Sequence, residues 1–147
     1  MSILNLKYPH LLPVDIPCWE AFLRVKGHEF TRFEYDIRVG DGADVPLDYP
    51  EPMRKMVNDL SKKRIDAVGF TASAIYTIEI TRHAGLKAIG QLISYPILYR
   101  HSYPTIIPII PLLVAEDLIT DIKLIIIAMD IPIWLSGANP TAIEAPH

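Results

Sequence analysis

Apolar and polar positions recur with more than one period along the chain, and each change of period predicts a new element. Apolar residues at helical spacing after Asp15 predict a first helix through about Val25, capped by the Asp15 carboxylate and ended by Gly27. Residues 30–39 alternate loosely and predict a strand, and a turn rich in glycine and proline follows. A second helix is predicted by four apolar residues at helical spacing: Met53, Met56, Val57 and Leu60.

The middle of the chain changes from strand to helix. Residues 65–70 and 75–81 are short apolar runs joined by a short turn, which predicts a β-hairpin. From about His83 the apolar positions return to helical spacing, which predicts a third helix. The remainder predicts strand, helix and strand at residues 112–115, 117–129 and 131–136. The predicted order is therefore αβαββαβαβ, an α/β or mixed α+β fold.

Pro108 and Pro111 interrupt an apolar run that begins at Ile106. Because proline has no N–H to donate to a sheet ladder, residues 106–111 are predicted to form an extended connector rather than a central strand. An extended chain sends alternate side chains to opposite sides, so the segment from Ile106 to Leu113 cannot all face one small core. We therefore expect part of it to pack against another chain, in a homo-oligomer or a larger assembly.

Length and composition narrow the class of protein. A chain of 147 residues and 16.6 kDa predicts one domain, with residues 1–14 as an N-terminal extension and 137–147 as a C-terminal tail. The formal net charge of -3 argues against a generally basic nucleic-acid-binding surface, and the single cysteine excludes an internal disulfide. We see no signal peptide, and the longest apolar run is too short to span a bilayer. We expect a cytoplasmic protein with no membrane partner.

Asp66 and Glu79 are lone carboxylates in the two apolar strands of the predicted hairpin. If these strands are antiparallel neighbours, the two side chains can meet on one face, roughly 3–5 Å apart. Two close carboxylates repel each other, and a divalent cation between them relieves the repulsion. The alternative is that both residues simply face solvent on an amphipathic hairpin.

A polar stripe follows on the third helix, where Lys87, Gln91 and Tyr95 are spaced four residues apart. The combination resembles the PD-(D/E)XK nuclease superfamily. Its pattern is an aspartate in one strand, Glu-x-Lys in the next, and often Gln-x-x-x-Tyr on the following helix. Here these are Asp66, the stretch that begins with Glu79, and the stretch from Gln91 to Tyr95. The resemblance covers roughly residues 16–136 in topology.

The resemblance implies a central mixed sheet flanked by helices and a metal-dependent nuclease that hydrolyses phosphodiester bonds. It implies that Asp66 and Glu79 hold Mg²⁺ or Mn²⁺ and that Gln91 and Tyr95 position the substrate. Many members carry a glutamate on the first helix, and Glu20 could be that residue. The implied partner is nucleic acid, contacted through a basic set: Lys62, Lys63, Arg64 and Arg82.

The chain departs from the family pattern at two positions. Thr81 stands where the family has a lysine, and a threonine hydroxyl carries no charge with which to replace an ammonium group. Lys87, on the Gln91 face of the helix, is the better substitute, since relocated lysines occur in this superfamily; the alternative is that Lys87 is an ordinary solvated lysine of the helix surface. The second departure is Pro96, which predicts that the third helix kinks or ends at Tyr95.

These departures leave two functions open. One is an active or residual nuclease. The other is a catalytically silent nuclease fold that serves as a structural component of a large assembly, such as the head-to-tail or tail part of a phage virion. In that case the location is the host cytoplasm or the virion. The five histidines show no metal-ligand spacing and are assigned to the surface.

Overall fold

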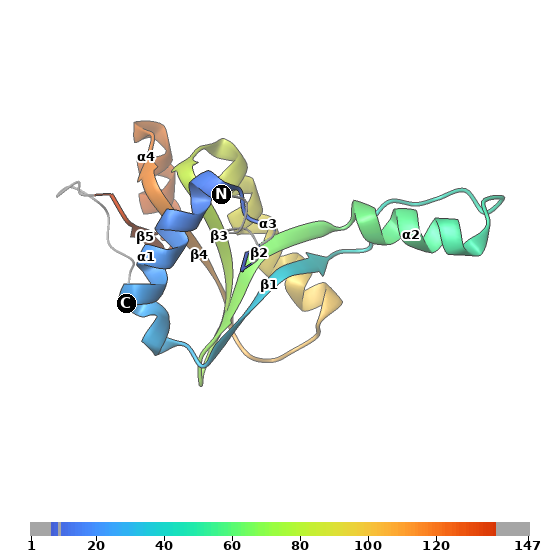
Figure 1. The fold of residues 1–147 in the computed structure, drawn as a ribbon, viewed down its shortest axis with the longest axis horizontal. Coiled ribbons are helices and arrows are strands. Elements are labelled where there is room, and N and C mark those ends of the chain that lie inside the picture. Colours follow the sequence, from blue (N-terminus) through green and yellow to red (C-terminus); the bar gives the residue numbers. More distant parts are fainter. Residues whose placement is uncertain (1–6, 9, 138–147) are drawn as a thin grey trace.

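The computed structural model describes residues 7, 8 and 10–137. Within them, a five-stranded sheet in the order β1-β2-β3-β4-β5 carries α1, α3 and α4 against its faces, and α2 projects away from it (Figure 1). The helices are α1 (Ile16–Lys26), α2 (Glu51–Ser61), α3 (Leu86–Ser102) and α4 (Thr120–Met129). The strands are β1 (Arg32–Val39), β2 (Lys63–Phe70), β3 (Ile75–Ala84), β4 (Ile109–Leu118) and β5 (Ile133–Leu135). The predicted order αβαββαβαβ is confirmed.

The sheet is mixed. β1 pairs with β2 and β2 with β3 in antiparallel fashion, whereas β3 pairs with β4 and β4 with β5 in parallel. The predicted hairpin is confirmed, because β2 ends at Phe70, β3 begins at Ile75 and the two strands are neighbours. The parallel pairs are joined by the crossover helices α3 and α4, as parallel strands require.

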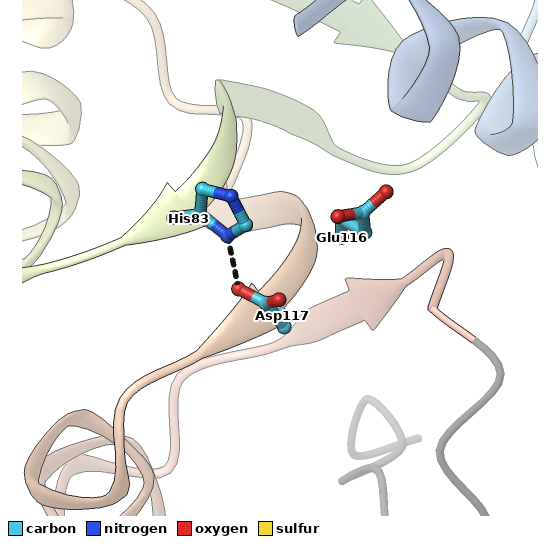
Figure 2. A group of neighbouring side chains, drawn as sticks. All are labelled: His83, Glu116 and Asp117. Atoms are coloured by element: carbon cyan, nitrogen blue, oxygen red, sulfur yellow. Dashed lines mark hydrogen bonds and ion pairs between the residues drawn. The ribbon is translucent and has the colours of Figure 1, made fainter. Parts of the chain in front are cut away.

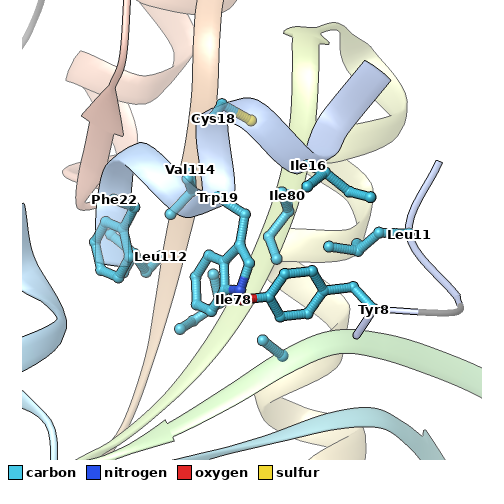
Figure 3. Packing of buried hydrophobic residues seen from close by; sticks show 11 residues of the cluster. Tyr8, Leu11, Ile16, Cys18, Trp19, Phe22, Ile78, Ile80, Leu112 and Val114 are labelled. Carbon is cyan, nitrogen blue, oxygen red and sulfur yellow. The ribbon is translucent and has the colours of Figure 1, made fainter. Parts of the chain in front are cut away.

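Period-2 alternation along β3 and β4 divides the core between the two faces of the sheet. On one face, Trp19 and Phe22 of α1 stack with ring centroids 5.3 Å apart (Figure 3). They pack against four inward-facing strand residues: Ile78, Ile80, Leu112 and Val114. Each such side chain contributes about 1.5–3 kcal/mol when fully buried. The sheet is thereby fixed to α1 along β3 and β4.

The opposite face is covered by α3 and α4. The alternate residues of β4, Leu113 and Ala115, pack there with three fully or nearly fully buried helix residues: Leu92, Ile122 and Ile126. Further along α3, Tyr95 and Tyr99 pack over β1 and β2. Glu79 alternates with Ile78 and Ile80, so its side chain lies on the α3 side of β3.

The prediction that residues 106–111 avoid the sheet is wrong in its second half. β4 begins at Ile109 and contains Pro111, which faces Thr77 of β3. β5 joins β4 only from Leu113, so the proline lies where β4 has a single neighbour in the sheet. This placement is compatible with a proline, which has no backbone N–H, because no strand lies on the other side of β4 at Pro111 to accept a hydrogen bond.

The structure differs from the sequence predictions at three helix ends: the cap of α1, the start of α3 and, of the two possibilities given for Pro96, the end of α3 at Tyr95. Within the described residues the Asp15 carboxylate makes no capping hydrogen bond to the first turn of α1 and instead binds β3. The third helix starts at Leu86, because β3 runs on to Ala84. It does not end at Tyr95 but continues through Pro96 to Ser102. The buried Tyr99, packed on the sheet beyond the proline, offsets the roughly 3 kcal/mol that an interior proline costs.

Two further observations concern the ends of the chain and the possibility of a membrane-spanning helix. Of the predicted extension and tail, residues 1–6, 9 and 138–147 lie outside the described residues. None of the described helices combines the length and the apolar character needed to cross a membrane.

Candidate active site

The candidate site lies where β2 and β3 separate. Their backbone pairing stops at Ala67 and Ile78, although β2 continues beside β1 and β3 continues beside β4. Two carboxylates replace the missing ladder. Asp66 Oδ2 accepts a 2.9 Å hydrogen bond from the backbone N–H of Ile80. The separation therefore leaves side chains, rather than a neighbouring strand, along this edge of β3.

Asp15 binds a second backbone N–H of β3. Its Oδ1 accepts a 2.8 Å hydrogen bond from the backbone N–H of Arg82, two residues beyond Ile80. Alternate N–H groups of a strand point to the same side, so both carboxylates bind the side of β3 that has lost β2. Burial raises the pKa of Asp15 against the opposing effect of the Arg82 bond.

A cleft of about 470 Å³ opens in this gap. Its lining comes from three parts of the chain: the segment before α1, strands β2 and β3, and the first turns of α3. Polar residues that line it include three carboxylates, two cationic or imidazole groups and an amide: Asp15, Asp66, Glu79, His10, Lys87 and Gln91. The cleft thus gathers residues that lie up to about eighty positions apart in the sequence.

Glu79 is the most unusual group in the cleft. Its side chain is only 4% exposed, and its Oε1 has no hydrogen-bond partner among the described residues. Burial above all, then the negative charge of Asp66 and a hydrogen bond with it, raises the pKa of Glu79 to about 10, while Lys87 acts in the opposite direction. The metal-free protein therefore carries a proton on Glu79 at neutral pH. The expectation that Glu79 faces solvent is excluded by its burial.

Asp66 lies beside Glu79 and is only partly exposed to the cleft. Burial raises the pKa of Asp66 as well, against the lowering effects of the Ile80 N–H bond and of nearby His10. Both side chains line the same cleft, and each carboxyl affects the pKa of the other. The register places them together, because Asp66 and Glu79 are the next residues beyond the last paired residues, Ala67 and Ile78.

The stripe on α3 only partly enters the cleft. Lys87 and Gln91 line it, with Lys87 exposed at the mouth. Tyr95 lies behind them, buried among the core residues, and its hydroxyl accepts a 3.4 Å hydrogen bond from Gln91 Nε2. Thr81 lines the cleft on the same side of β3 as Glu79, two residues on. The structure therefore brings together Asp66, Glu79, Lys87 and Gln91 and leaves Tyr95 to support Gln91.

The remaining sequence candidates lie away from the cleft lining. Glu20 is on α1, partly exposed. Three of the basic residues are paired with acids at the surface: Lys62 with Asp59, Arg64 with Asp36 and Arg82 with Glu116. Lys63 is exposed at the start of β2. None of these four basic residues lines the cleft.

Sequence reasoning missed three polar cleft residues: Asp15, His10 and His83. The position of Asp15 just before an apolar helix singled it out in the sequence, but that position predicted only a helix cap and not a place in the cleft. His10 had no recognisable spacing, yet its Nε2 donates a 2.9 Å hydrogen bond to the backbone carbonyl of Asp66, and its ring lies 5.9 Å from that of Tyr35. These contacts hold the segment before α1 against β2.

A second group of possible ligands lies near the end of β3. His83, Glu116 and Asp117 place one ligand atom each within 4.8 Å of one another (Figure 2). His83 Nδ1 is 2.5 Å from Asp117 Oδ1, and Glu116 pairs with Arg82 at 3.1 Å. Both members of the His83–Asp117 pair are more than half exposed. Each of these three side chains therefore has a polar partner near the surface. The buried Glu79 oxygen has none among the described residues.

Comparisons with known proteins add little to this geometry. No protein-family model matches the sequence, and no curated protein matches it significantly. The chain is similar to the solved structure "Structure of EndoMS-dsDNA2 complex", with a TM-score of 0.48 and 16% sequence identity. The match covers 93% of this chain and 47% of that chain, so this chain spans about half the length of that protein. So distant a likeness carries no argument about function.

Proposed function

We propose that the cleft binds a divalent cation, Mg²⁺ or Mn²⁺, between Asp66 and Glu79 and that the protein hydrolyses phosphodiester bonds in nucleic acid. The observation that carries the proposal is the buried Glu79 oxygen without a hydrogen-bond partner among the described residues, beside a second carboxylate and open to a cleft. An acceptor left unsatisfied in this way costs about 1–3 kcal/mol, which a bound cation would recover.

The donor set fits a hard cation. Carboxylate oxygens are the preferred protein ligands of Mg²⁺, which commonly takes only one or two of them and completes its shell with water and phosphate. Asp66 and Glu79 would supply those two, and Asp15 contributes further negative charge to the same cleft. When bound, such an ion polarises a phosphate and lowers the pKa of an attacking water.

The chain's own residues would orient the substrate. Lys87 at the mouth of the cleft would attract a phosphate group and stabilise charge that develops on it. Gln91, tied to the Tyr95 hydroxyl, would hold a neighbouring oxygen of the substrate. Lys62, Lys63 and Arg64 would contact the sugar-phosphate backbone on the approach along β2 without reading sequence.

The alternative is a catalytically silent nuclease-like fold within a large assembly, such as a virion. Two observations favour it. Thr81 supplies no charge at the position of the family lysine. Ile106 and Ile107 are 99% and 43% exposed, so the apolar segment before β4 remains free for another chain. In this alternative the carboxylate pair is a remnant and binds no ion.

Calorimetric titration with Mg²⁺ and with Mn²⁺ separates the two functions. We expect the wild type to bind and Asp66→Ala to bind at least about 10–100-fold more weakly. Glu20→Gln is the matched control, because that carboxylate lies outside the cleft lining. A wild type that binds neither ion, together with no cleavage of labelled DNA or RNA, would overturn the proposed nuclease function.

A further inference from the structure

β1 contains a residue with left-handed backbone. Asp36 has a φ of 55° although it lies inside the strand. Non-glycine residues seldom adopt a positive φ, and aspartate is one of those that tolerate it. Asp130, which also has a positive φ, directly follows α4, where left-handed backbone is common at a helix end. Asp36 has no helix end to explain its conformation, and an outlier of this kind inside a strand is typical of bulges beside functional sites.

The ladder between β1 and β2 is interrupted at the same position. The backbone pairing skips Asp36 and Asp66, which lie opposite each other, and includes the residues on either side of them. At this interruption the carbonyl of Asp66 accepts its 2.9 Å hydrogen bond from His10 Nε2. From here β1 and β2 leave β3 and run together toward α2 (Figure 1). The left-handed residue therefore lies where the cleft opens.

Both strands change the face that they present to the core at this point. On one side of the skipped pair, Tyr35 and Ala67 pack in the cluster that α1 covers. On the other side, Ile37 and Ile65 pack in the cluster that α3 covers. Residues two apart in a strand normally share a face, so each strand has turned over. A bulge-like residue bends a strand and increases its twist, so the conformation of Asp36 accounts for the turn, which β2 follows through the ladder.

The side chain of Asp36 is attached to β2. Arg64 Nη1 donates to Oδ1 and Oδ2 of Asp36 at 3.3 and 3.4 Å, and Arg64 lies two residues before Asp66 in β2. Both side chains of this ion pair are partly exposed, and pairs of that kind contribute little to stability. We therefore attribute the turn to the backbone conformation of Asp36 rather than to its charge.

We propose that Asp36 is a positioning residue for Asp66, the candidate metal ligand. Because the turn sends the residues on either side of Asp66 to opposite faces of the sheet, Asp66 itself points along the sheet toward β3. Backbone N–H groups of a strand lie in that direction, and Asp66 Oδ2 accepts its 2.9 Å bond from one of them, the N–H of Ile80. The inference rests on the proposed function only where it calls Asp66 a metal ligand.

The scalar coupling across the Asp66–Ile80 hydrogen bond, measured by NMR on the metal-free full chain, tests the proposal. We expect a coupling between the carboxyl carbon of Asp66 and the amide nitrogen of Ile80 in the wild type. Asp36→Val should lose it, because a β-branched residue is strained at a positive φ. Asp36→Gly should retain it, because glycine adopts a positive φ freely. A residue that merely supported the strand would give the opposite order, since strands favour valine and disfavour glycine.

Glu34→Val is the matched control. Glu34 is an exposed, ion-paired acid of the same strand that lies in the regular ladder, so its replacement should leave the Ile80 coupling unchanged. The corresponding coupling between Asp15 and Arg82 should persist in every variant and verifies that each is folded. If Asp36→Val does not fold, Asp36→Ala makes the same comparison, because alanine is also strained at a positive φ.

Calorimetric titration with Mg²⁺ then connects the inference to the proposed function. Asp36→Val should bind Mg²⁺ about 10–100-fold more weakly than the wild type, whereas Asp36→Gly should bind it like the wild type. A wild type that binds no Mg²⁺ would refute the proposed function and leave the comparison of couplings intact. A wild type without the Asp66–Ile80 coupling, a coupling retained in Asp36→Val, or one lost equally in Asp36→Gly would each overturn the inference itself.

Discussion

Glu79 is a buried carboxyl in the wall of the candidate site. Because β3 alternates between two packed faces, its carboxyl is buried on the α3 side, next to the Asp66 carboxyl. Removing a carboxylate from water disfavours its charged form, and a neighbouring negative charge disfavours it further. The folded chain therefore stabilises a protonated Glu79 in the absence of a cation.

This environment makes stability depend on pH. The pKa of Glu79 is raised from 4.5 to about 10 on folding, so between these values the folded chain retains a proton that the unfolded chain has lost. The free energy of unfolding should therefore fall as pH rises through this window, by at most about 1.4 kcal/mol per pH unit. Glu79→Gln should reduce the decline, and what remains is the share of other carboxyls with a raised pKa, such as Asp66.

Urea denaturation across this pH range in the presence of a chelator measures the effect. Glu20→Gln, which changes a carboxylate outside the cleft lining, should follow the wild-type curve. If Glu79→Gln parallels the wild type at every pH, the carboxyl is not held protonated by the fold.

If the protein is the nuclease proposed above, its turnover should depend on Lys87. Thr81 supplies no charge, and Lys87 is the lysine that lines the cleft among the described residues. In a nuclease assay with labelled DNA and RNA, Lys87→Ala should lower turnover by about 10²–10³. Thr81→Lys should raise turnover. An unchanged rate in Lys87→Ala would show that the lysine has not been relocated to α3.

At the scale of elements, hydrophobic period was sufficient to predict the order of helices and strands. The hydrophobic period did not predict features that depend on which segments the tertiary fold brings together. Asp15 has the type and position of a helix cap, and only the tertiary fold brings the N–H of Arg82 within its reach. Pro111 excludes a strand with two hydrogen-bonded neighbours, but the sequence does not show that β5 begins beyond it.

The Asp15 contact predicts a measurable loss of stability. Asp15→Ala would leave the Arg82 N–H without its partner at an edge where β2 has departed. An unsatisfied donor of this kind costs about 1–3 kcal/mol in the free energy of unfolding. Asp15→Asn retains an accepting oxygen and should lose much less. Equal stabilities of the two variants, measured by urea denaturation, would contradict this role.

At the scale of the molecule, the candidate site was predictable only in part. Asp66, Glu79, Lys87 and Gln91 lie within a short span of sequence, so local spacing could associate them. His10 comes from a distant segment whose contact with Asp66 depends on the whole fold. Local spacing also fails for Tyr95, because the burial that removes it from the cleft is set by β1 and β2.

The apolar segment before β4 gives a prediction about assembly. Leu112 and Leu113 are buried in the chain's own core, which leaves Ile106 and Ile107 as the exposed apolar residues of that run. If the segment contacts another chain, Ile107→Asp should dissociate that assembly with the fold intact. Light scattering after size-exclusion chromatography detects the change, with Leu124→Asp as control. An unaltered mass in Ile107→Asp would remove the segment from any interface.

The gap between β2 and β3 also turns two backbone amides into spectroscopic reporters. The N–H groups of Ile80 and Arg82 are each bound by a different carboxylate, Asp66 and Asp15. Their hydrogen-exchange rates should therefore report separately on the two acids. Asp66→Ala should accelerate exchange at Ile80 by about tenfold and leave Arg82 unchanged. If a cation draws the Asp66 carboxylate away from Ile80, titration with Mg²⁺ would be visible at this one amide before any substrate is known.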